Sequence, residues 1–439
     1  MSALRASDHA AFLDALAGHG TLNVDPDALE LAAWDISGRG PEAPIAIAAP
    51  TSVEALQRVV IAAAAQKRAM VPRSAALSYT GGVWCARPGS IAIDTTHLPV
   101  TLEPHEDSAT VSVSATWAEL YDALAKRQQR ALVFGPLSGH RARIGGGLSQ
   151  NLAFYGSARH GFLSCTVREV SIVDAAGHLH NRTDTKPFIG DGGTLGIKVA
   201  ACLAVAPMPR IVRFASLHLT DSAALAKAFT ILAEHPDRAV LSEAYAFDPV
   251  THSQLSRGGF EVLDAVALTR ETLAGADPRA RFASLFGLAR MRPARLAGLR
   301  YSLHLVAEGG DEADVAKRLA AICGALRKTG ARPLPDTIPR VTRARPFRPI
   351  KQLVGPNGER WLPSHGILPA SHLDVALRTV ERFAADHGST LAEHHIKMSL
   401  LVALIGEEVI VEPQLFWPDS LSTYLAANVL PGQAAAFAG

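Results

Sequence analysis

The sequence predicts an α+β protein with at least two domains. Strands and helices alternate along the first half of the 439 residues, and the second half repeats strand and helix segments in a different rhythm. Hydrophobic residues make up 48% of the chain and charged residues 19%, which is typical of a globular enzyme with a large core. This length predicts two or three domains, or one large two-lobed protein.

The first β-α-β unit is predicted around residues 46 to 94. A strand near residue 46 precedes Thr51 and Glu54, whose spacing is that of a capping box that opens a helix. The segment IAID at 91–94 predicts the next strand. Between them, the turn-rich loop at 72–82 is the first candidate site.

A second unit begins with the alternating segment ATVSVSA at 109–115. Thr116 and Glu119 have capping-box spacing and predict a helix. Further on, REVSIVD and a strand around Leu179 predict a hairpin, with Ala175-Ala176-Gly177 at its turn. Pro207 and Pro209 indicate a domain boundary.

The chain beyond this boundary predicts an antiparallel sheet backed by helices. The segments RFASLHL and YSLHLVAE are strand-like, and each precedes a helix with an apolar stripe. In a third such unit, Ser371 is the predicted helix cap and Gly388 the terminator, followed by the strands SLLVALI and EVIVEPQLFW. Helices packed on one side of an antiparallel sheet are characteristic of α+β domains.

Charge and cysteine content exclude several classes of protein. Forty-three Lys and Arg against 41 Asp and Glu give a formal charge of +2, and no platform of aromatic residues interleaves with the arginines between Arg332 and Arg360, so no nucleic-acid partner is expected. The four cysteines lack disulfide-framework or zinc-finger spacing. No signal peptide or membrane-spanning run is evident. We expect a cytoplasmic protein, with peripheral attachment to a membrane left open.

Glycines are concentrated in three loops of the first 200 residues: Gly81-Gly82, Gly145 to Gly147, and the segment GDGGTLG at 190–196. Glycine lets the backbone approach the pyrophosphate of a dinucleotide closely. A nicotinamide-binding Rossmann unit is disfavoured, because the last glycine of GDGGTLG comes one residue too late and the next segment is strand-like.

The order and spacing of five blocks carry a family resemblance. They are PRSAALSYTGG, IAIDTTHL, GPLSGHRARIGGGLSQNLAFYGSARHG, REVSIVDAAGHLH and GDGGTLGIKVAACLAV. Through them, the chain from about 46 to 209 resembles the FAD domain of the vanillyl-alcohol-oxidase family, also called the PCMH-type FAD-binding domain. The resemblance implies an N-terminal helical segment over 1–45, a two-subdomain FAD-binding domain over 46–209, and an α+β cap domain with an antiparallel sheet over 210–439.

The resemblance also implies a set of cofactor contacts. The residues that would wrap the pyrophosphate or line the flavin are Pro72, Arg73, Ser74, Ala75, Ala76, Leu77, Ser78, Pro136, Gly139, Ile144, Gly145, Gly146, Asn151, Gly156, Ser157, Gly196 and Ile197. Core packing would account equally well for Ile144 and Ile197 taken alone. Members that tether FAD covalently through the first loop have a histidine where Leu77 stands, so we predict non-covalent FAD. Ser74, Ala75 and Ala76 replace glycines that are usual in the family.

The cap segments resemble members of the family that oxidise 2-hydroxy acids, such as D-lactate dehydrogenases. The implied enzyme transfers hydride from a small 2-hydroxy acid to flavin N5 and passes electrons to oxygen, a quinone or a protein carrier. The candidate catalytic residues are His394, His395, Arg348, Arg360 and Glu412. Adjacent histidines on a strand would point to opposite faces, so at most one would enter a pocket. We expect a hydrogen-bonded cap histidine and no metal.

Two other functions stay open from the sequence. One is the oxidation of a phenolic or other alcohol on the same fold, and the other is a degenerate flavin-fold binding protein that does not catalyse a reaction. The family usually continues past the cap into a segment that returns to the flavin, whereas this sequence stops shortly after the cap strands. We expect that this segment is either lost or supplied by a second subunit or a homodimer partner.

Overall fold

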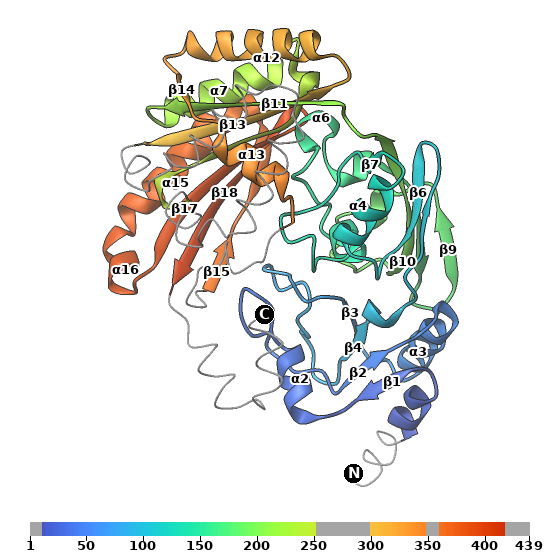
Figure 1. Cartoon of the computed structure of the whole chain (residues 1–439). Coiled ribbons are helices and arrows are strands. Elements are labelled where there is room, and N and C mark those ends of the chain that lie inside the picture. Colours follow the sequence, from blue (N-terminus) through green and yellow to red (C-terminus); the bar gives the residue numbers. More distant parts are fainter. Residues whose placement is uncertain (1–10, 252–298, 348–359, 418–439) are drawn as a thin grey trace. The chain divides into compact units, whose positions relative to one another are not determined.

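The chain folds into two compact units. The computed structural model describes residues 11–251, 299–347 and 360–417 (Figure 1). The first unit contains the chain up to Leu152 and Leu163–Pro207, and the second contains Ala153–Phe162 and the described chain from Met208 onward. Residues 153–162, which the sequence analysis assigned to the FAD-binding domain, thus pack with the second unit.

One layer of the first unit is a four-stranded sheet. Its order is β1 (Thr21–Asn23), β2 (Ala46–Ala49), β4 (Ile91–Asp94) and β3 (Met70–Arg73). Strands β2, β4 and β3 are parallel, as a β-α-β unit requires, and β1 is antiparallel to β2. The segment before residue 46, predicted to be helical, thus supplies this edge strand as well as helix α2 (Pro26–Ala32).

Helix α3 (Val53–Ala65) is the helix predicted in this β-α-β unit, but its cap differs from the prediction. Ser52 is the N-cap, and its hydroxyl accepts a hydrogen bond from the backbone N–H of Ala55 at 3.1 Å. The predicted box from Thr51 to Glu54 is therefore wrong by one residue. Serine and threonine are both good caps, so the local pattern does not choose between them.

The other sheet of the first unit is antiparallel. Its strands are β5 (Leu102–Pro104), β6 (Ser108–Ser112), β10 (Ile197–Pro207), β8 (Val167–Val173) and β9 (Leu179–Arg182), and β7 (Gln129–Ala131) pairs with β10. Helix α4 (Trp117–Ala125) begins with the predicted capping box of Thr116 and Glu119, which is confirmed. The strand predicted after GDGGTLG is β10, which lies at the centre of the sheet.

The predicted hairpin joins β8 and β9 through a turn organised by Asp174. Its Oδ1 accepts hydrogen bonds from the backbone N–H groups of Ala176 and His178, each at 2.9 Å. Gly177 has a φ of +84°, which suits glycine. The hydrogen bond from His180, followed by those from the backbone, lowers the pKa of Asp174 to about 2.

The second unit is built on an eight-stranded antiparallel sheet. Seven strands follow the order β14 (Arg332–Leu334), β11 (Ile211–Leu219), β13 (Tyr301–Gly309), β12 (Leu241–Phe247), β17 (Lys397–Ile405), β18 (Glu408–Trp417) and β15 (Arg360–Pro363). The eighth strand, β16 (Gly366–Pro369), also pairs with β18. This confirms the antiparallel sheet predicted for the cap.

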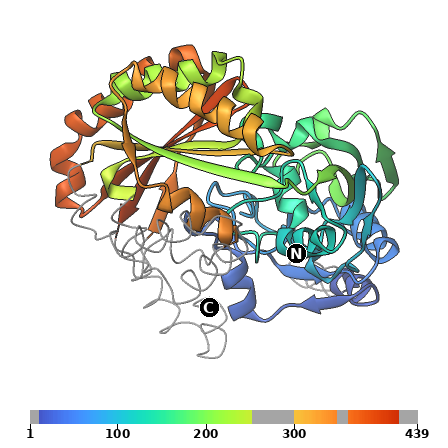
Figure 2. The same ribbon diagram turned by 45° about the horizontal axis from the view of Figure 1, so that its top comes forward.

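One face of this sheet is covered by three helices, α7 (Ser222–Glu234), α12 (Glu312–Arg327) and α15 (Leu373–Asp386) (Figure 2). Their apolar stripes pack on alternate residues of the strands, including Leu303, Leu305 and Val402. Helix α15 follows a short 3-10 turn and is capped at His372 rather than at Ser371. Gly388, the predicted terminator, instead begins the short helix α16 (Gly388–Glu393).

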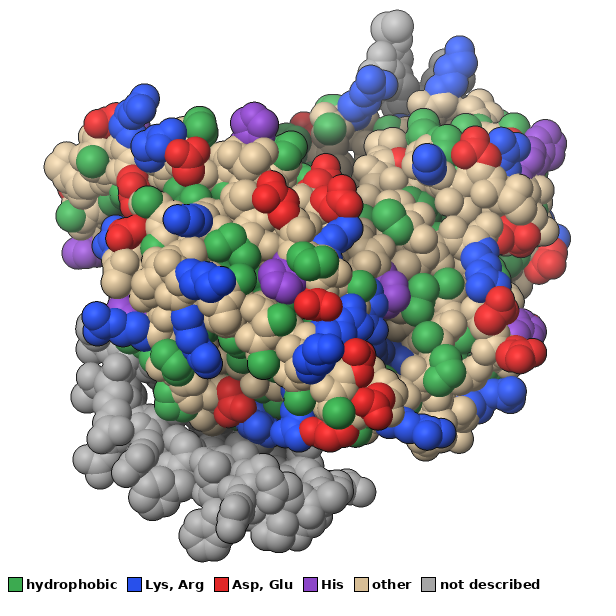
Figure 3. All heavy atoms as spheres, turned by 90° about the horizontal axis from the view of Figure 1, so that it is seen from above, with side chains coloured by type: hydrophobic (Ala, Val, Ile, Leu, Met, Phe, Trp, Pro, Cys, Tyr) green, Lys and Arg blue, Asp and Glu red, His purple; other side chains and the backbone are tan. Residues whose placement is uncertain are grey.

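The surface carries charges of both signs. On the face shown in Figure 3, Lys and Arg side chains are intermingled with Asp and Glu, in keeping with the small formal net charge. No helix in the described part of the chain is both long enough and apolar enough to cross a bilayer.

Candidate functional site

The first glycine-containing loop leaves the end of β3 and is held by the segment around Asp35. Asp35 is buried, and its Oδ2 accepts a hydrogen bond from the backbone N–H of Gly81 at 3.0 Å. The backbone N–H of Ile36 donates to the carbonyl of Ser78 at 2.9 Å. The Ser78 hydroxyl accepts from Gly82 N–H at 2.9 Å, so both ends of this loop segment are fixed.

The second loop leads into helix α5 (Ile144–Ser149), where the three glycines differ in their surroundings. A Cβ atom at Gly145 would lie 2.9 Å from Cβ of Val113, and one at Gly147 would lie 2.7 Å from the ring of Trp117. Both positions therefore require glycine for close packing. At Gly146, no atom of the described residues outside the helix lies within 4 Å of the added Cβ.

The third loop, at 190–196, is tied to the end of α5. The backbone N–H groups of Gly190 and Gly192 donate to the carbonyls of Leu148 and Ser149, each at 2.9 Å. Inside the loop, Asp191 pairs with Lys198 of β10 at 2.6 Å, and both side chains are almost fully buried. Burial lowers the pKa of Lys198, and the hydrogen bond to Asp191 opposes that shift.

The three loops meet within the first unit. A Cβ at Gly193 of the third loop would lie 3.8 Å from Oγ of Ser149 and 3.9 Å from Cγ of Pro72, at the start of the first loop. A Cβ at Gly82 would lie 3.3 Å from the amide nitrogen of Gln150, which follows α5. Residues more than 100 positions apart therefore form one glycine-rich site.

This site fits the diphosphate of a dinucleotide. Oγ of Ser74 is buried and has no hydrogen-bond partner among the described residues, so it is available to a phosphate oxygen. The free space at Gly146 allows close approach to the backbone. Arg73, at the end of β3, donates to the carbonyl of Ala32 at 2.8 Å, and burial lowers its pKa while Asp94 raises it.

The loop adopts a left-handed turn although its glycines are replaced. Ala76 has a φ of +52°, a conformation that costs a residue with a Cβ about 1–2 kcal/mol. Leu77 follows it in the same loop. The alanine that replaces a usual glycine at position 76 thus adopts a strained backbone conformation.

We expect Ala76→Gly to stabilise the protein by about 0.5–1 kcal/mol, because the strain at positive φ disappears while some chain entropy is added to the unfolded state. Ala75 is the matched control, since it is not among the residues with positive φ in the described chain. Ala75→Gly should be destabilising by a similar amount. Urea unfolding of both variants measures the difference, and equal effects would argue against strain at Ala76.

The remaining predicted cofactor residues of the first unit border the same loops. Gly139 N–H donates to the carbonyl of Pro136 at 3.0 Å in a turn beside the start of α4. Asn151 has a φ of +49°, and its Oδ1 accepts from Ser164 N–H at 2.9 Å. Gly196 and Ile197 lead into β10. Their contacts with the cofactor stay predictions.

Gly156 and Ser157, also predicted near the cofactor, are tied into the second unit. Gly156 has a φ of +83°, caps helix α6 (Ser157–His160), and donates its N–H to Oε1 of Glu243 at 3.2 Å. The carbonyl of Ser157 accepts from Gly406 N–H at 2.9 Å. This turn was visible in the sequence as part of the flavin block, but its partners 80 and more residues away were not.

Glu243 belongs to a buried ionic cluster that the sequence analysis did not anticipate. Arg343 of helix α13 (Thr337–Ala344) donates to Oε1 of Glu243 at 3.1 Å and also pairs closely with Glu308 of β13. Exposed fractions are 9% for the arginine side chain and 3% and 1% for the glutamates. The hydroxyl of Ser242 gives Glu243 a further hydrogen bond at 2.6 Å.

The face of the cap sheet opposite α7, α12 and α15 carries polar side chains. On β18, Glu412 and Gln414 point to this face, and Ser399 of β17 pairs with Gln414. Ser399 Oγ donates to Gln414 Oε1 at 3.0 Å, and the Gln414 amide donates to Oε1 of Glu412. His365 Nδ1 lies 3.8 Å from the other oxygen of Glu412. Burial raises the pKa of Glu412, and Gln414 and His365 partly oppose this.

A buried histidine lies on the same face. His304 is 1% exposed, and its two ring nitrogens lie 2.8 Å from the hydroxyls of Ser216 and Ser302. The rings of Tyr245 and Phe247 pack against it at centroid distances of 5.4 and 5.6 Å. The sequence analysis did not anticipate this cluster, although Ser and His alternate in both β11 and β13 and could have indicated it.

The other predicted catalytic residues lie elsewhere or outside the described chain. His394 and His395 are exposed and lie in the turn that ends α16, not on a strand, so the strand prediction is wrong. His395 has a φ of +55°, and Ile396 N–H donates to the Leu391 carbonyl at 2.7 Å, which completes a Schellman helix ending. Arg348 lies outside the described residues, and only the backbone of Arg360 is described, at the start of β15.

Known proteins show similarity to both the sequence and the fold. Residues 44–182 match the family described as FAD binding domain. The glycolate oxidase subunit GlcD of Bacillus subtilis (strain 168) is 23% identical over 189 residues, which cover 40% of this chain and 40% of that protein. The match thus spans less than half of the curated relative.

Three solved structures share the fold at low identity. p-Cresol methylhydroxylase has a TM-score of 0.68 at 13% identity and covers 98% of this chain and 86% of its own. 4-Ethylphenol oxidase from Gulosibacter chungangensis has a TM-score of 0.65 at 13% identity, and the match covers 94% of this chain and 83% of that one. An alkyldihydroxyacetonephosphate synthase has a TM-score of 0.63 at 15% identity, and the match covers 91% of this chain and 72% of that one. With the matched segment and the converging loops, the chain carries an FAD-binding domain over residues 44–182, its cofactor is FAD, and it shares the fold of these three structures.

Proposed function

We propose that the protein is an FAD-dependent oxidoreductase that oxidises a small 2-hydroxy acid of the D-lactate or glycolate type. The observation that carries this proposal is the FAD-binding domain together with similarity to a protein named as a glycolate oxidase subunit. Bound FAD would supply the hydride acceptor. The chain's own residues would hold the substrate and take up the proton of its hydroxyl group.

Glu412 is the proposed proton acceptor. It is a buried carboxylate with a raised pKa, so it holds a proton more firmly than an exposed glutamate does. The hydrogen bonds from Ser399 to Gln414 and from Gln414 to Glu412 fix its orientation. His365, 3.8 Å from the free oxygen, can exchange a proton with it after a small movement of either side chain.

A cation is also needed to hold the carboxylate of the substrate. Arg348 and Arg360 stay the predicted candidates for this role. We assign no step to His394 and His395, because both are exposed in a helix-ending turn.

A substrate screen with an artificial electron acceptor tests the proposal. Full-length protein reconstituted with FAD should reduce the acceptor with D-lactate or glycolate. Turnover of para-substituted phenols without turnover of any hydroxy acid would reject it and favour the second candidate, a phenol oxidase. That candidate is supported by the fold shared with 4-ethylphenol oxidase and p-cresol methylhydroxylase.

We further propose that a second subunit or a homodimer partner completes the active site. The relative GlcD is itself named as a subunit, which supports this proposal. Light scattering of the purified protein, and assay with and without a co-expressed partner chain, would test it. Full activity of a monomer would reject the requirement for a partner.

Glu412→Gln is expected to remove activity while stabilising the fold at high pH. Burial raises the pKa of Glu412 above its ordinary value of 4.5, so the folded state binds this proton more tightly than the unfolded state. The resulting stabilisation is complete below that value and is lost as pH rises through the folded-state pKa. The neutral glutamine avoids this loss, so the melting temperature of the variant relative to the parent should rise as the pH increases above 4.5.

The control is Glu408→Gln, which changes an exposed glutamate on the same strand. It should leave turnover unchanged. A melting difference for Glu412→Gln that does not change as the pH increases above 4.5 would contradict the assignment of a raised pKa.

A further inference from the structure

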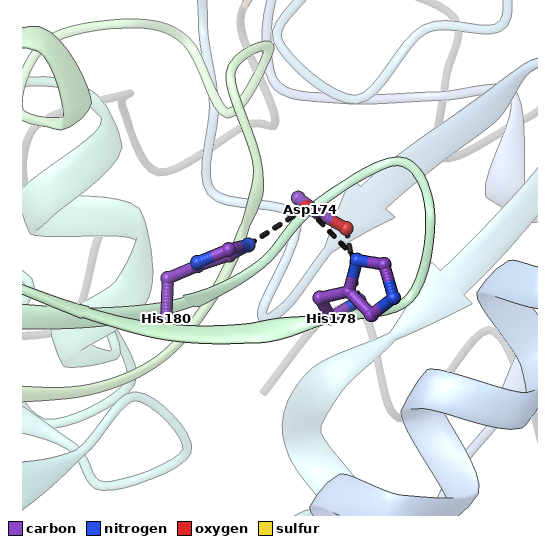
Figure 4. Close-up of side chains that lie close together, drawn as sticks. All are labelled: Asp174, His178 and His180. Carbon is purple, nitrogen blue, oxygen red and sulfur yellow. Dashed lines mark hydrogen bonds and ion pairs between the residues drawn. The ribbon is translucent and has the colours of Figure 1, made fainter.

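The β8–β9 hairpin brings three metal-binding side chains together on the surface of the first unit. Asp174, His178 and His180 each offer one ligand atom, and these atoms lie within 4.8 Å of one another. Figure 4 shows both imidazoles directed toward the carboxylate. His180 Nε2 lies 2.7 Å and His178 Nδ1 lies 3.7 Å from Oδ2 of Asp174.

Hydrogen bonds from the backbone of the turn fix the orientation of the Asp174 carboxylate. Oδ1 of Asp174 is occupied by two backbone N–H groups of the turn, which leaves Oδ2 directed at the two histidines. The turn is itself fixed, because the Gln57 amide of helix α3 donates to the carbonyl of Gly177 at 2.7 Å. Hydrogen bonds of this kind orient the ligands in known metal sites.

After small rotations of the histidine side chains, the three ligand atoms suit an ion with tetrahedral coordination. Bonds of about 2.0–2.1 Å in a tetrahedral zinc site place neighbouring ligand atoms roughly 3.3 Å apart. The histidine side chains are 74% and 43% exposed, so they can rotate by the required amount and leave a fourth position to water. Two imidazole nitrogens favour Zn²⁺ and similar transition metals over Mg²⁺ or Ca²⁺.

We propose that Asp174, His178 and His180 form a surface site for Zn²⁺ that is separate from FAD binding. The position of His178 favours a metal site over a hydrogen-bonded pair that only stabilises the hairpin. The hydrogen bond between His180 and Asp174 would by itself be enough to stabilise the hairpin, without His178. The ring of His178 is the most exposed of the three and lies too far from Asp174 Oδ2 for a hydrogen bond.

Zinc titration of the full-length chain after chelator treatment tests the proposal. Isothermal calorimetry should detect one Zn²⁺ per chain, and Co²⁺ in its place should give the visible absorption of a tetrahedral site. His178→Ala should weaken Zn²⁺ binding at least about tenfold, since it removes a ligand but no hydrogen bond, and Asp174→Asn should do the same. Circular dichroism and melting temperature check that each variant is folded.

His105→Ala is the matched control, because His105 is an exposed histidine in another hairpin of the same unit. It should leave zinc binding unchanged. Equal Zn²⁺ affinity for the parent and His178→Ala, or no stoichiometric binding by the parent, would overturn the proposal. Neither result depends on FAD content or on turnover.

Discussion

Gly146→Asp is expected to weaken FAD binding at least about 100-fold, which corresponds to about 2.7 kcal/mol. The resemblance places Gly146 beside the pyrophosphate, and the structure leaves the space at its Cβ position free of described residues outside the helix. An aspartate there would fill this space and place a negative charge beside two phosphates. Flavin fluorescence quenching during FAD titration measures the loss.

The same variant should remain folded, because the added side chain meets no neighbour in the described chain. Gly324→Asp, at an equally open position on helix α12 of the second unit, is the matched control and should bind FAD normally. Gly147→Ala should behave differently from both, since its Cβ would lie 2.7 Å from the Trp117 ring and would destabilise the fold. Normal FAD affinity of Gly146→Asp would contradict the placement of the pyrophosphate.

Arg343→Met is expected to destabilise the protein by about 3–5 kcal/mol, the usual cost of leaving a buried ion pair without one partner. Here two glutamates, Glu243 and Glu308, would lose the guanidinium that links β12 and β13 to α13. Their side chains are almost fully buried, so water cannot replace it. Chemical unfolding followed by circular dichroism measures the change.

A triple variant keeps this prediction testable if Arg343→Met alone folds poorly. Adding Glu243→Gln and Glu308→Gln removes the two buried negative charges that Arg343 faces and should recover a large part of the lost stability. Arg378→Met removes an exposed pair with Asp374 on helix α15 and should cost at most about 1 kcal/mol. An effect of Arg343→Met no larger than that of Arg378→Met would contradict a stabilising role for the cluster.

Local patterns predicted most elements of the fold. The box of Thr116 and Glu119, the β8–β9 hairpin and the strand after GDGGTLG each depend on residues within one short segment, and all were found. The errors arose where a short segment can adopt either of two local structures. Ser52 caps α3 in place of its neighbour, and the paired histidines end a short helix because His395 accepts a left-handed conformation.

The parts of the site that the sequence could not predict depend on distant contacts. Asp35 supports Gly81 across 46 residues, and Arg343 pairs with Glu243 across 100. Neither spacing has a periodic signature, since such contacts are set by packing of separate elements. The family blocks indicated which loops meet, but not which buried charges hold them.

We predict that this chain binds FAD non-covalently in its first unit. The most direct test of this binding is the absorption spectrum of the purified protein, before and after acid precipitation. We predict flavin absorbance near one FAD per chain, recovered in the supernatant after precipitation. Protein without flavin that also fails to bind added FAD would contradict the claim and favour a degenerate flavin fold, and flavin retained in the pellet would contradict non-covalent binding.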